Sequence, residues 1–382
     1  MRILIWADAF WPEIGGLEVF CMHLVLRLKE RGHDCLIITE RNTSRGWGLS
    51  YYQEIPVYGV TFHKASTNRD LRSMREQHEA CKQLIAQFNP EIIHLNSVMR
   101  GALGFMLQQR DRRRPAILTL HDDTLLEYQK GLVSAVFENV DAVVAISEFI
   151  RTKTLIHQPG FTDKLHIILN ALSMPEVLPL PFPAEPRLLA FGRFIKEKGF
   201  DLAIRAFAQL AHHFPKATLT LAGHGVEHAA LCSLAQETGF ADRIHFPGWI
   251  SPEDIPALIN QHSLVIMPGR WEEPFGLVAL QTAQMGRPII ASRAGGIPEI
   301  VLDGVTGKLF ESEDLPALTN CLQLLLENPA LCEQMGRQAH VQAKKYFCFD
   351  TFVAAYENLY RRVQAQREMN GDPGPITHRS VC

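Results

Sequence analysis

The chain has 382 residues, of which 47% are hydrophobic and 21% are charged. These proportions are typical of a globular protein in water, and the length favours two domains over a single core. The net charge of −3 argues against bulk binding of nucleic acid, and no apolar run is long enough to cross a membrane.

The first residues and the cysteines bear on the compartment of the protein. The start, MRILIWADAF, lacks the basic stretch, long apolar core and cleavage site of a secretory signal. None of the eight cysteines forms a Cys-x-x-Cys pair. We therefore expect reduced thiols in the cytoplasm, and neither a disulfide framework nor a metal site. The cysteines are Cys21, Cys35, Cys81, Cys232, Cys321, Cys332, Cys348 and Cys382.

Short apolar runs alternate with helical patterns through the first half of the chain. Strands are predicted at residues 3–7, 35–39, 57–62, 91–95, 116–120, 142–146 and 166–169. Helices are predicted at residues 16–31, 72–88, 102–109 and 148–157. Continuous apolar strands separated by helices indicate a parallel sheet that is covered on both faces.

The same alternation restarts after a proline-rich stretch. Residues 173–186 hold five prolines, and we predict a linker there because no helix or central strand tolerates that density. Strands are predicted at residues 188–191, 218–222, 244–246, 264–267 and 289–292. Helices are predicted at residues 201–214, 228–239, 252–261, 277–285, 315–327, 332–345 and 351–366. The pattern predicts two doubly wound α/β domains, which bind ligands at the carboxyl ends of their strands and in the cleft between them.

The segment from 268 to 299 carries the most chemical information. It combines an acidic pair, a tight turn, an apolar-faced helix and a second glycine turn, at Glu272-Glu273, Pro274-Phe275-Gly276, Leu277 onward and Gly295-Gly296. A glycine turn that opens a helix offers free backbone N–H groups to an anion such as phosphate. A carboxylate beside it suits sugar hydroxyls. Together they favour a nucleotide-sugar site over a plain nucleotide site.

Residues 191–200, FGRFIKEKGF, run from a strand through a glycine turn into a helix. Arg193 and Lys198 lie just before that helix, and two cations at a helix start suit a diphosphate. A solvated basic loop is the alternative interpretation. The later loop Gly223-His224-Gly225 is similar in form, although any strand-to-helix turn can look this way.

Two features of the first half follow predicted strands. Gly15 and Gly16 open the first helix after the first strand, where an ordinary turn is the alternative. His121 and Asp122 follow the strand 116–120, at the edge where an α/β sheet exposes functional groups, and a buried structural histidine is the alternative there. His94 also ends a strand, and we interpret it as structural or acceptor-side.

With these motifs the chain resembles the retaining glycosyltransferases of family 4, which have the GT-B fold of two Rossmann-like domains. The family carries Glu-x7-Glu running into Pro-Phe-Gly-Leu, and Glu273 takes its first acidic position. The second falls on Gln281, which keeps a carbonyl acceptor for the ribose but lacks the charge. The resemblance therefore implies weaker or altered nucleotide binding with an intact fold.

The resemblance also implies a role for each motif. His121 and Glu273 would be the catalytic residues. The other donor-binding residues would hold the diphosphate, sugar and ribose, and they are Gly15, Gly16, Arg193, Lys198, Gly223, Gly225, Phe275, Gly276, Leu277 and Gln281. No metal motif appears, so Arg193 and Lys198 would neutralise the departing diphosphate without a metal or other cofactor.

The resemblance sets the expected domain limits as well. An acceptor-side domain would cover residues 1–172, and the linker 173–186. A nucleotide-sugar domain would cover residues 187–345. A helix at 346–368 would cross back to the first domain, and the tail 369–382 would be disordered.

The expected reaction is sugar transfer from a nucleoside diphosphate sugar, with retention of configuration, to a glycan, a lipid-linked glycan or a metabolite. Same-face attack and double displacement both stay open as mechanisms. A non-catalytic sugar-nucleotide-binding partner subunit and a GT-B epimerase are the alternatives, the first motivated by Gln281. We expect a cytoplasmic protein without a nucleic-acid partner. The basic run 110–114 is best explained as a solvated helix end, with peripheral contact at the inner membrane face as the alternative.

Overall fold

The computed structural model describes the chain except residues 12–15, 42–45, 97–113, 124–125, 127–129 and 370–382. The helix predicted at 102–109, Gly15, most of the basic run and nearly all of the tail lie outside the described residues. The chain divides into two compact units. The first unit consists of Met1–Leu169 together with Asp350–Cys382, and the second unit is Asn170–Phe349.

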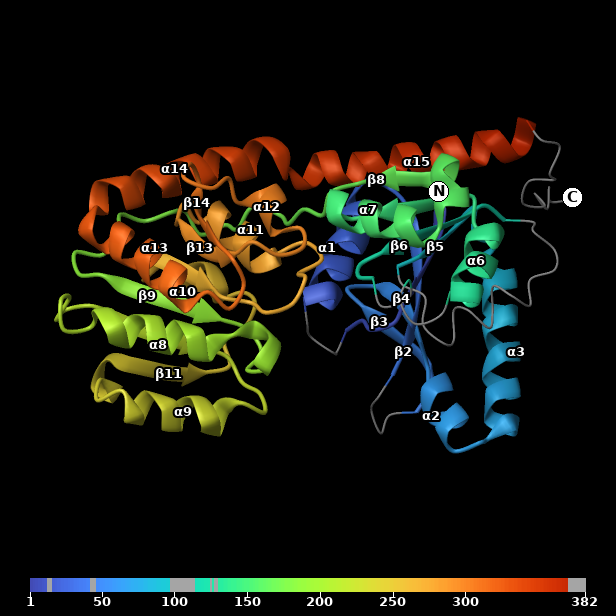
Figure 1. Ribbon diagram of the computed structural model, residues 1–382. Helices are drawn as coiled ribbons and strands as arrows, with labels where there is room; N and C mark the ends of the chain where they lie inside the picture. Colours follow the sequence, from blue (N-terminus) through green and yellow to red (C-terminus); the bar gives the residue numbers. More distant parts are fainter. Residues whose placement is uncertain (12–15, 42–45, 97–113, 124–125, 127–129, 370–382) are drawn as a thin grey trace, which may run out of the picture. The chain divides into compact units, whose positions relative to one another are not determined.

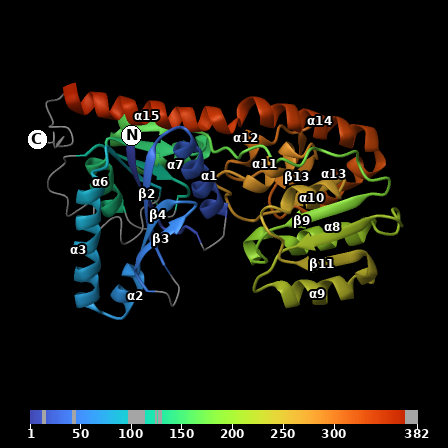
Figure 2. The same ribbon diagram turned by 180° about the vertical axis from the view of Figure 1, so that it is seen from behind.

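The first unit contains an eight-stranded sheet in the order β3-β4-β2-β1-β5-β6-β7-β8. Its strands are β1 (Arg2–Ala7), β2 (Asp34–Glu40), β3 (Gly48–Tyr52), β4 (Ile55–Val60), β5 (Ile92–Leu95), β6 (Ala116–Leu120), β7 (Ala142–Ala145) and β8 (Leu165–Ile167). Its helices are α1 (Gly16–Glu30), α2 (Phe62–Thr67), α3 (Leu71–Phe88), α6 (Lys130–Asn139), α7 (Glu148–His157) and α15 (Phe349–Met369). The sheet lies between α1 on one side and α3 and α6 on the other (Figures 1 and 2). The predicted α/β class is confirmed.

The edge of this sheet differs from the prediction. The predicted elements include no strand at residues 48–52, but these residues form β3, which pairs antiparallel with β4. The two connecting residues, Gln53 and Glu54, have φ of 46° and 65°. Positive φ at both positions is the geometry of a two-residue hairpin turn, which normally uses Asn and Gly. Because Gln-Glu is an unusual pair for that turn, the sequence did not reveal the hairpin.

Helix α15 completes the first unit by covering its core. Its Tyr356 and Tyr360 are fully buried, and the Tyr360 hydroxyl lies 2.8 Å from Nδ1 of His94. Nε2 of His94 lies 2.8 Å from the Thr119 hydroxyl, which lies 2.9 Å from that of Tyr356. His94 therefore ties α15 to β5 and β6, which agrees with a structural role.

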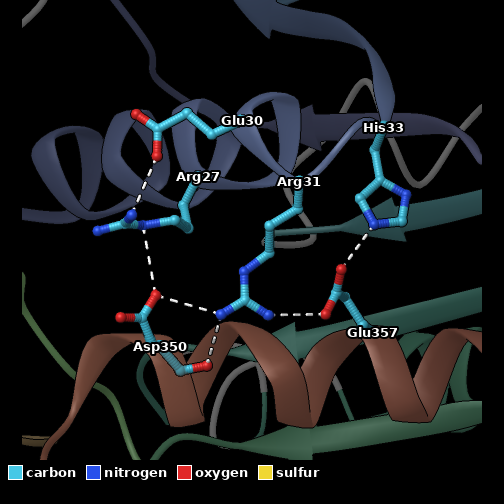
Figure 3. Close-up of polar contacts among 6 residues, drawn as sticks. All are labelled: Arg27, Glu30, Arg31, His33, Asp350 and Glu357. Carbon is cyan, nitrogen blue, oxygen red and sulfur yellow. Dashed lines mark hydrogen bonds and ion pairs between the residues drawn. The ribbon is translucent and has the colours of Figure 1, made fainter.

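Charged contacts fix the start of α15 against the end of α1 (Figure 3). Glu357 accepts from Arg31 Nη1 at 2.9 Å and lies 2.7 Å from Nε2 of His33. Asp350 accepts from Arg31 Nη2 at 3.1 Å and pairs with Arg27 at 3.6 Å. Burial acts to raise the pKa of Glu357, but its bonds to His33 and Arg31 outweigh this and lower the pKa below its ordinary value.

The second unit contains a six-stranded sheet in the order β11-β10-β9-β12-β13-β14, and all of its pairings are parallel. The strands are β9 (Arg187–Phe191), β10 (Thr218–Ala222), β11 (Ile244–Gly248), β12 (Leu264–Met267), β13 (Ile289–Ser292) and β14 (Gly307–Phe310). The helices are α8 (Phe200–Leu210), α9 (His228–Glu237), α10 (Ile255–Asn260), α11 (Leu277–Gln284), α12 (Ile297–Ile300), α13 (Leu315–Glu327) and α14 (Pro329–Tyr346). Strand order reverses at β9, which places a switch point between the loops after β9 and β12.

The proline-rich stretch belongs to the second unit and is anchored along its length. The Leu180 N–H donates to Asn260, and the Asn260 amide donates to the Leu178 carbonyl. Arg287 is 1% exposed, donates to the Pro181 carbonyl, and lies 4.3 Å from the centroid of the Phe182 ring. These contacts hold the stretch in an extended conformation against the surface of the second unit.

Candidate functional site

Three side chains meet after the carboxyl ends of β9 and β12. Nζ of Lys198 lies 2.6 Å from Oε2 of Glu273, and the two side chains are 20% and 16% exposed. Nε1 of Trp271 donates to the same carboxylate oxygen at 3.0 Å, and the Lys198 ammonium lies 4.9 Å from the centroid of the Trp271 ring. The carboxylate and the ammonium are thus paired and partly open to solvent, so polar groups of a ligand can replace either partner.

The turn that carries Lys198 is held by its neighbours. Gly199 has φ of 66°, and a Cβ there would lie 2.0 Å from the Pro268 carbonyl oxygen, so only glycine fits. The Arg270 N–H donates to the Glu197 carbonyl at 2.7 Å, and the Arg270 guanidinium binds Asp201 at 2.7 and 2.8 Å. Burial acts to raise the pKa of Asp201, but Arg270 outweighs it and lowers that pKa below its ordinary value. The loop after β12 therefore clamps the loop after β9.

The backbone of Glu273 packs closely against the glycine pair Gly295-Gly296, which follows β13. The Gly296 N–H donates to the Glu273 carbonyl at 2.8 Å. A Cβ at Gly295 would lie 2.2 Å from that same oxygen. The two glycines are needed for this close approach, so they fix the acidic turn.

Helix α11 starts directly after the acidic turn. Gly276, with φ of 107°, precedes Leu277, the first helical residue, and the N–H groups of a first turn have no helical carbonyl to bind. The Phe275 ring is buried against Phe347 at 5.9 Å, so only its backbone can face a ligand. Gln281 lies one turn into α11, on the same partly exposed face as Leu277.

The remaining residues predicted in the second unit lie on two loops in contact with each other. A Cβ at Gly223 would lie 1.9 Å from the Gly192 carbonyl oxygen, and one at Gly225 would lie 2.4 Å from that of Phe194. These glycines allow the loops after β9 and β10 to touch. The Arg193 side chain is exposed, and the structure gives it no hydrogen bond or ion pair with the described residues.

In the first unit, Gly16 starts α1 and His121 follows β6. His121 is partly buried, its ring packs edge-on against Phe20, and its Nε2 lies 3.1 Å from Oδ1 of Asn96. Desolvation lowers the pKa of His121 to about 3, so the imidazole is neutral at physiological pH. Gly15 lies outside the described residues.

Two features are absent from the described residues. No group of three His, Cys, Asp or Glu side chains there is arranged to hold a metal ion. Within the same part of the chain, no helix combines the length and apolar character needed to cross a membrane.

Comparison with known proteins follows the two halves of the chain. Residues 14–174 match the family model "Glycosyltransferase Family 4", and residues 180–342 match "Glycosyl transferases group 1". The glycogen synthase of Mycobacterium tuberculosis is 32% identical over 94% of this chain and 94% of its own length. The chain belongs to the family 4 glycosyltransferases. As the resemblance predicted, it is a glycosyltransferase, and neither alternative class is favoured.

Solved structures agree with the fold of this glycosyltransferase. Sucrose-phosphate synthase from Thermosynechococcus elongatus has a TM-score of 0.81 at 23% identity, covering 96% of this chain and 99% of that one. Anabaena HepE in complex with UDP-glucose has a TM-score of 0.77 at 20% identity, covering 95% of this chain and 100% of that one. These neighbours confirm the GT-B fold class.

Three residues of the glycosyltransferase contact predicted site residues or their loops but were not predicted themselves. They are Trp271 beside Glu273, Arg270 across the two loops, and Asn96 beside His121. Arg270 and Trp271 stand next to the acidic pair in the sequence, so their position was a usable signal. Asn96 directly follows a predicted strand, at the same sheet edge as His121, and that placement could have singled it out.

Proposed function

We propose that this glycosyltransferase takes its sugar from a nucleoside diphosphate sugar that binds on the second unit, and transfers it with retention of configuration. The observation that carries the proposal is the Lys198–Glu273 pair with Trp271 at the carboxyl edge of the sheet. An ammonium suits a phosphate oxygen, and a carboxylate suits the hydroxyls of a sugar. A ligand with both groups can replace each half of the ion pair with a matching contact.

The proposed roles follow the chemistry of each group. Lys198 and Arg193 bind the diphosphate, and the first-turn N–H groups of α11, near Gly276 and Leu277, add their dipole. Glu273 orients the transferred sugar, and Gln281 contacts the ribose. Support comes from Arg193, which is exposed without a protein partner among the described residues, and from Gln281, which lies on the open face of α11.

The other proposed contacts come from glycine loops and from the first unit. Gly223 and Gly225 shape the loop beside the nucleotide, and Gly16 and His121 contact the substrate, His121 as a neutral imidazole. Gly15 shares the role of Gly16 in the proposal, although it lies outside the described residues.

We further propose that transfer needs no metal and no other cofactor. The negative charge of the leaving diphosphate would be stabilised by Arg193, Lys198 and the helix dipole of α11. The acceptor would be a hydroxyl-bearing glycan, lipid-linked glycan or metabolite. The free and largely buried cysteines of the described residues support the cytoplasm as the compartment. The proposal also includes peripheral contact of the protein with the inner face of the membrane.

The test begins with thermal stabilisation by UDP-glucose, ADP-glucose, GDP-mannose, a CMP-sugar and a dTDP-sugar, with hydrolysis of each followed in parallel. A ligand at 100 times its Kd adds about 2.7 kcal/mol to the free energy of unfolding, which is easily detected. We expect one donor class to stabilise the protein and to be hydrolysed slowly.

Two matched variants locate the active carboxylate. Glu273→Gln should lower turnover by about 100-fold or more at an unchanged fold, because the sugar loses its charged acceptor. Glu272→Gln, one residue away and exposed, should stay within a few-fold of the unmodified protein. Unchanged turnover in Glu273→Gln would exclude the assignment of Glu273.

A further inference from the structure

Asn96 lies in the first unit at the carboxyl end of β5, next to β6. Its backbone N–H donates to the Trp6 carbonyl at 2.8 Å, which fixes its position after the strand. The residue is only 1% exposed. Its Oδ1 contacts Nε2 of His121 at 3.1 Å, whereas its Nδ2 has no hydrogen-bond partner among the residues that the structure describes.

A buried amide donor without a partner is costly. Leaving such a group unsatisfied forfeits its hydration without a replacement bond, and native proteins satisfy the large majority of their buried polar atoms. The Nδ2 donor of Asn96, unpaired among the described residues, is therefore available to a ligand, and a substrate is the natural candidate next to His121.

The contact indicates which nitrogen of His121 carries the proton. With the amide oxygen of Asn96 toward the ring, Nε2 must carry the hydrogen and donate it, because a carbonyl oxygen can only accept. The neighbouring His94 is also neutral, because burial lowers its pKa to about 3, so it places no positive charge beside His121. With a neutral ring and a protonated Nε2, Nδ1 of His121 carries a lone pair that can accept a hydrogen bond.

We propose that Asn96 is a further substrate-binding residue, whose Oδ1 holds His121 in the Nε2–H form and whose Nδ2 donates to a hydroxyl oxygen of the substrate. The pair then offers one acceptor, His121 Nδ1, and one donor, Asn96 Nδ2. Sugar hydroxyls both donate and accept, so they match this pair. The inference rests on the proposed function, because it takes the ligand to be a sugar of the donor or of the acceptor.

The first experiment reads the pair without any substrate, by NMR of the histidine rings across pH. In the unmodified protein, His121 should show the Nε2–H form and should not titrate between pH 8 and pH 5. Asn96→Asp keeps an acceptor and adds a negative charge, so the His121 pKa should rise into that range. An Nδ1–H form, or a His121 pKa unaffected by the aspartate, would overturn the pairing.

The second experiment compares the nucleotide sugar that best stabilises the unmodified protein with its free nucleoside diphosphate. If the hydroxyl belongs to the donor, Asn96→Leu should lower the affinity for the sugar nucleotide about tenfold, equivalent to about 1.4 kcal/mol. Affinity for the free diphosphate should stay within about twofold, since its groups contact the second unit. If the hydroxyl belongs to the acceptor, donor affinity is kept and the acceptor KM rises by a similar factor.

Asn139→Leu is the matched control. Asn139 ends α6 before the amino end of β7, at the opposite edge of the sheet, and its amide donates to the Ala135 carbonyl. It should leave both affinities and the acceptor KM unchanged. If Asn96→Leu behaves like this control while the unmodified protein binds a donor, the inference on Asn96 fails alone. If no donor binds the unmodified protein, the proposed function fails, and the substrate role of Asn96 fails with it.

Discussion

At the scale of single residues, one carboxylate oxygen is shared by two donors of different kinds. Oε2 of Glu273 accepts from Lys198 and from Trp271. If Lys198 turned to a diphosphate, as the proposed function has it, the indole N–H would still hold the carboxylate in place. We therefore expect Trp271 to be a positioning residue that acts through Glu273 and Lys198.

Trp271→Phe separates the two contacts of the indole. Phenylalanine keeps an aromatic face for Lys198 but cannot donate to Glu273, and hydrogen bonds to charged groups contribute about 1.5–3 kcal/mol. We expect Trp271→Phe to lower kcat about tenfold or more with little change in KM. Trp271→Ala should lower kcat further, because it also removes the cation–π contact with Lys198. Steady-state kinetics measure this, with Trp47→Phe in the first unit as control. Equal kcat values for Trp271→Phe and the control would contradict the role.

The sequence indicated some of these residues better than others. Lys198 and Glu273 were selected because glycine turns and helix starts leave a recognisable pattern. Their 2.6 Å contact spans 75 positions and could not be deduced from either segment. Asn96 and Arg270 belong to no motif, and only their places after a strand and beside the acidic pair pointed to them. Their contacts form when the sheet brings separate loops together.

At the scale of elements, α15 shows how a helix is fixed by buried charge. The helix was predicted from its apolar spacing, but its partners lie more than 300 positions away, at Arg31 and His33. Periodicity predicts that a helix has a buried face, and it does not say what covers that face. For the same reason β3 and α2 were missed, because short edge elements have too few residues to establish a period.

Glu357→Gln tests this anchoring. The glutamate is 7% exposed and bonded to two basic side chains, and removal of one partner of a buried ion pair costs about 3–5 kcal/mol. We expect a clear fall in the free energy of unfolding of the first unit, measured by urea denaturation. Glu368→Gln, exposed near the end of the same helix, should change it by less than about 0.5 kcal/mol. Equal midpoints for the two variants would show that the cluster does not anchor α15.

At the scale of the whole molecule, two neutral histidines make the stability of the first unit depend on pH. His94 and His121 both have pKa values lowered to about 3 by burial, whereas an unfolded histidine titrates near pH 6.5. The unfolded chain thus binds more protons below pH 6.5. Their contribution is fully present above that pH and is lost as the pH falls toward 3.

The expected slope is about 1.4 kcal/mol per pH unit for each histidine below pH 6. His94→Gln should be less stable at pH 7, yet should show a shallower decline between pH 6 and pH 5. Urea unfolding at several pH values measures both quantities. His63→Gln, at an exposed position of the first unit, serves as control. An identical slope in His94→Gln and the unmodified protein would show that His94 is not kept neutral.

The two units also differ in whether they are formed by one segment of the chain or by two. The second unit is one continuous stretch, whereas the first unit needs α15, which follows the entire second unit in the sequence. During synthesis on the ribosome, the second unit can be completed while the earlier sheet still lacks its last helix. Until α15 emerges, His94 of the nascent first unit lacks Tyr360, and the apolar face that α15 covers is exposed. Emergence of α15, and not of the first 169 residues alone, therefore completes the first unit.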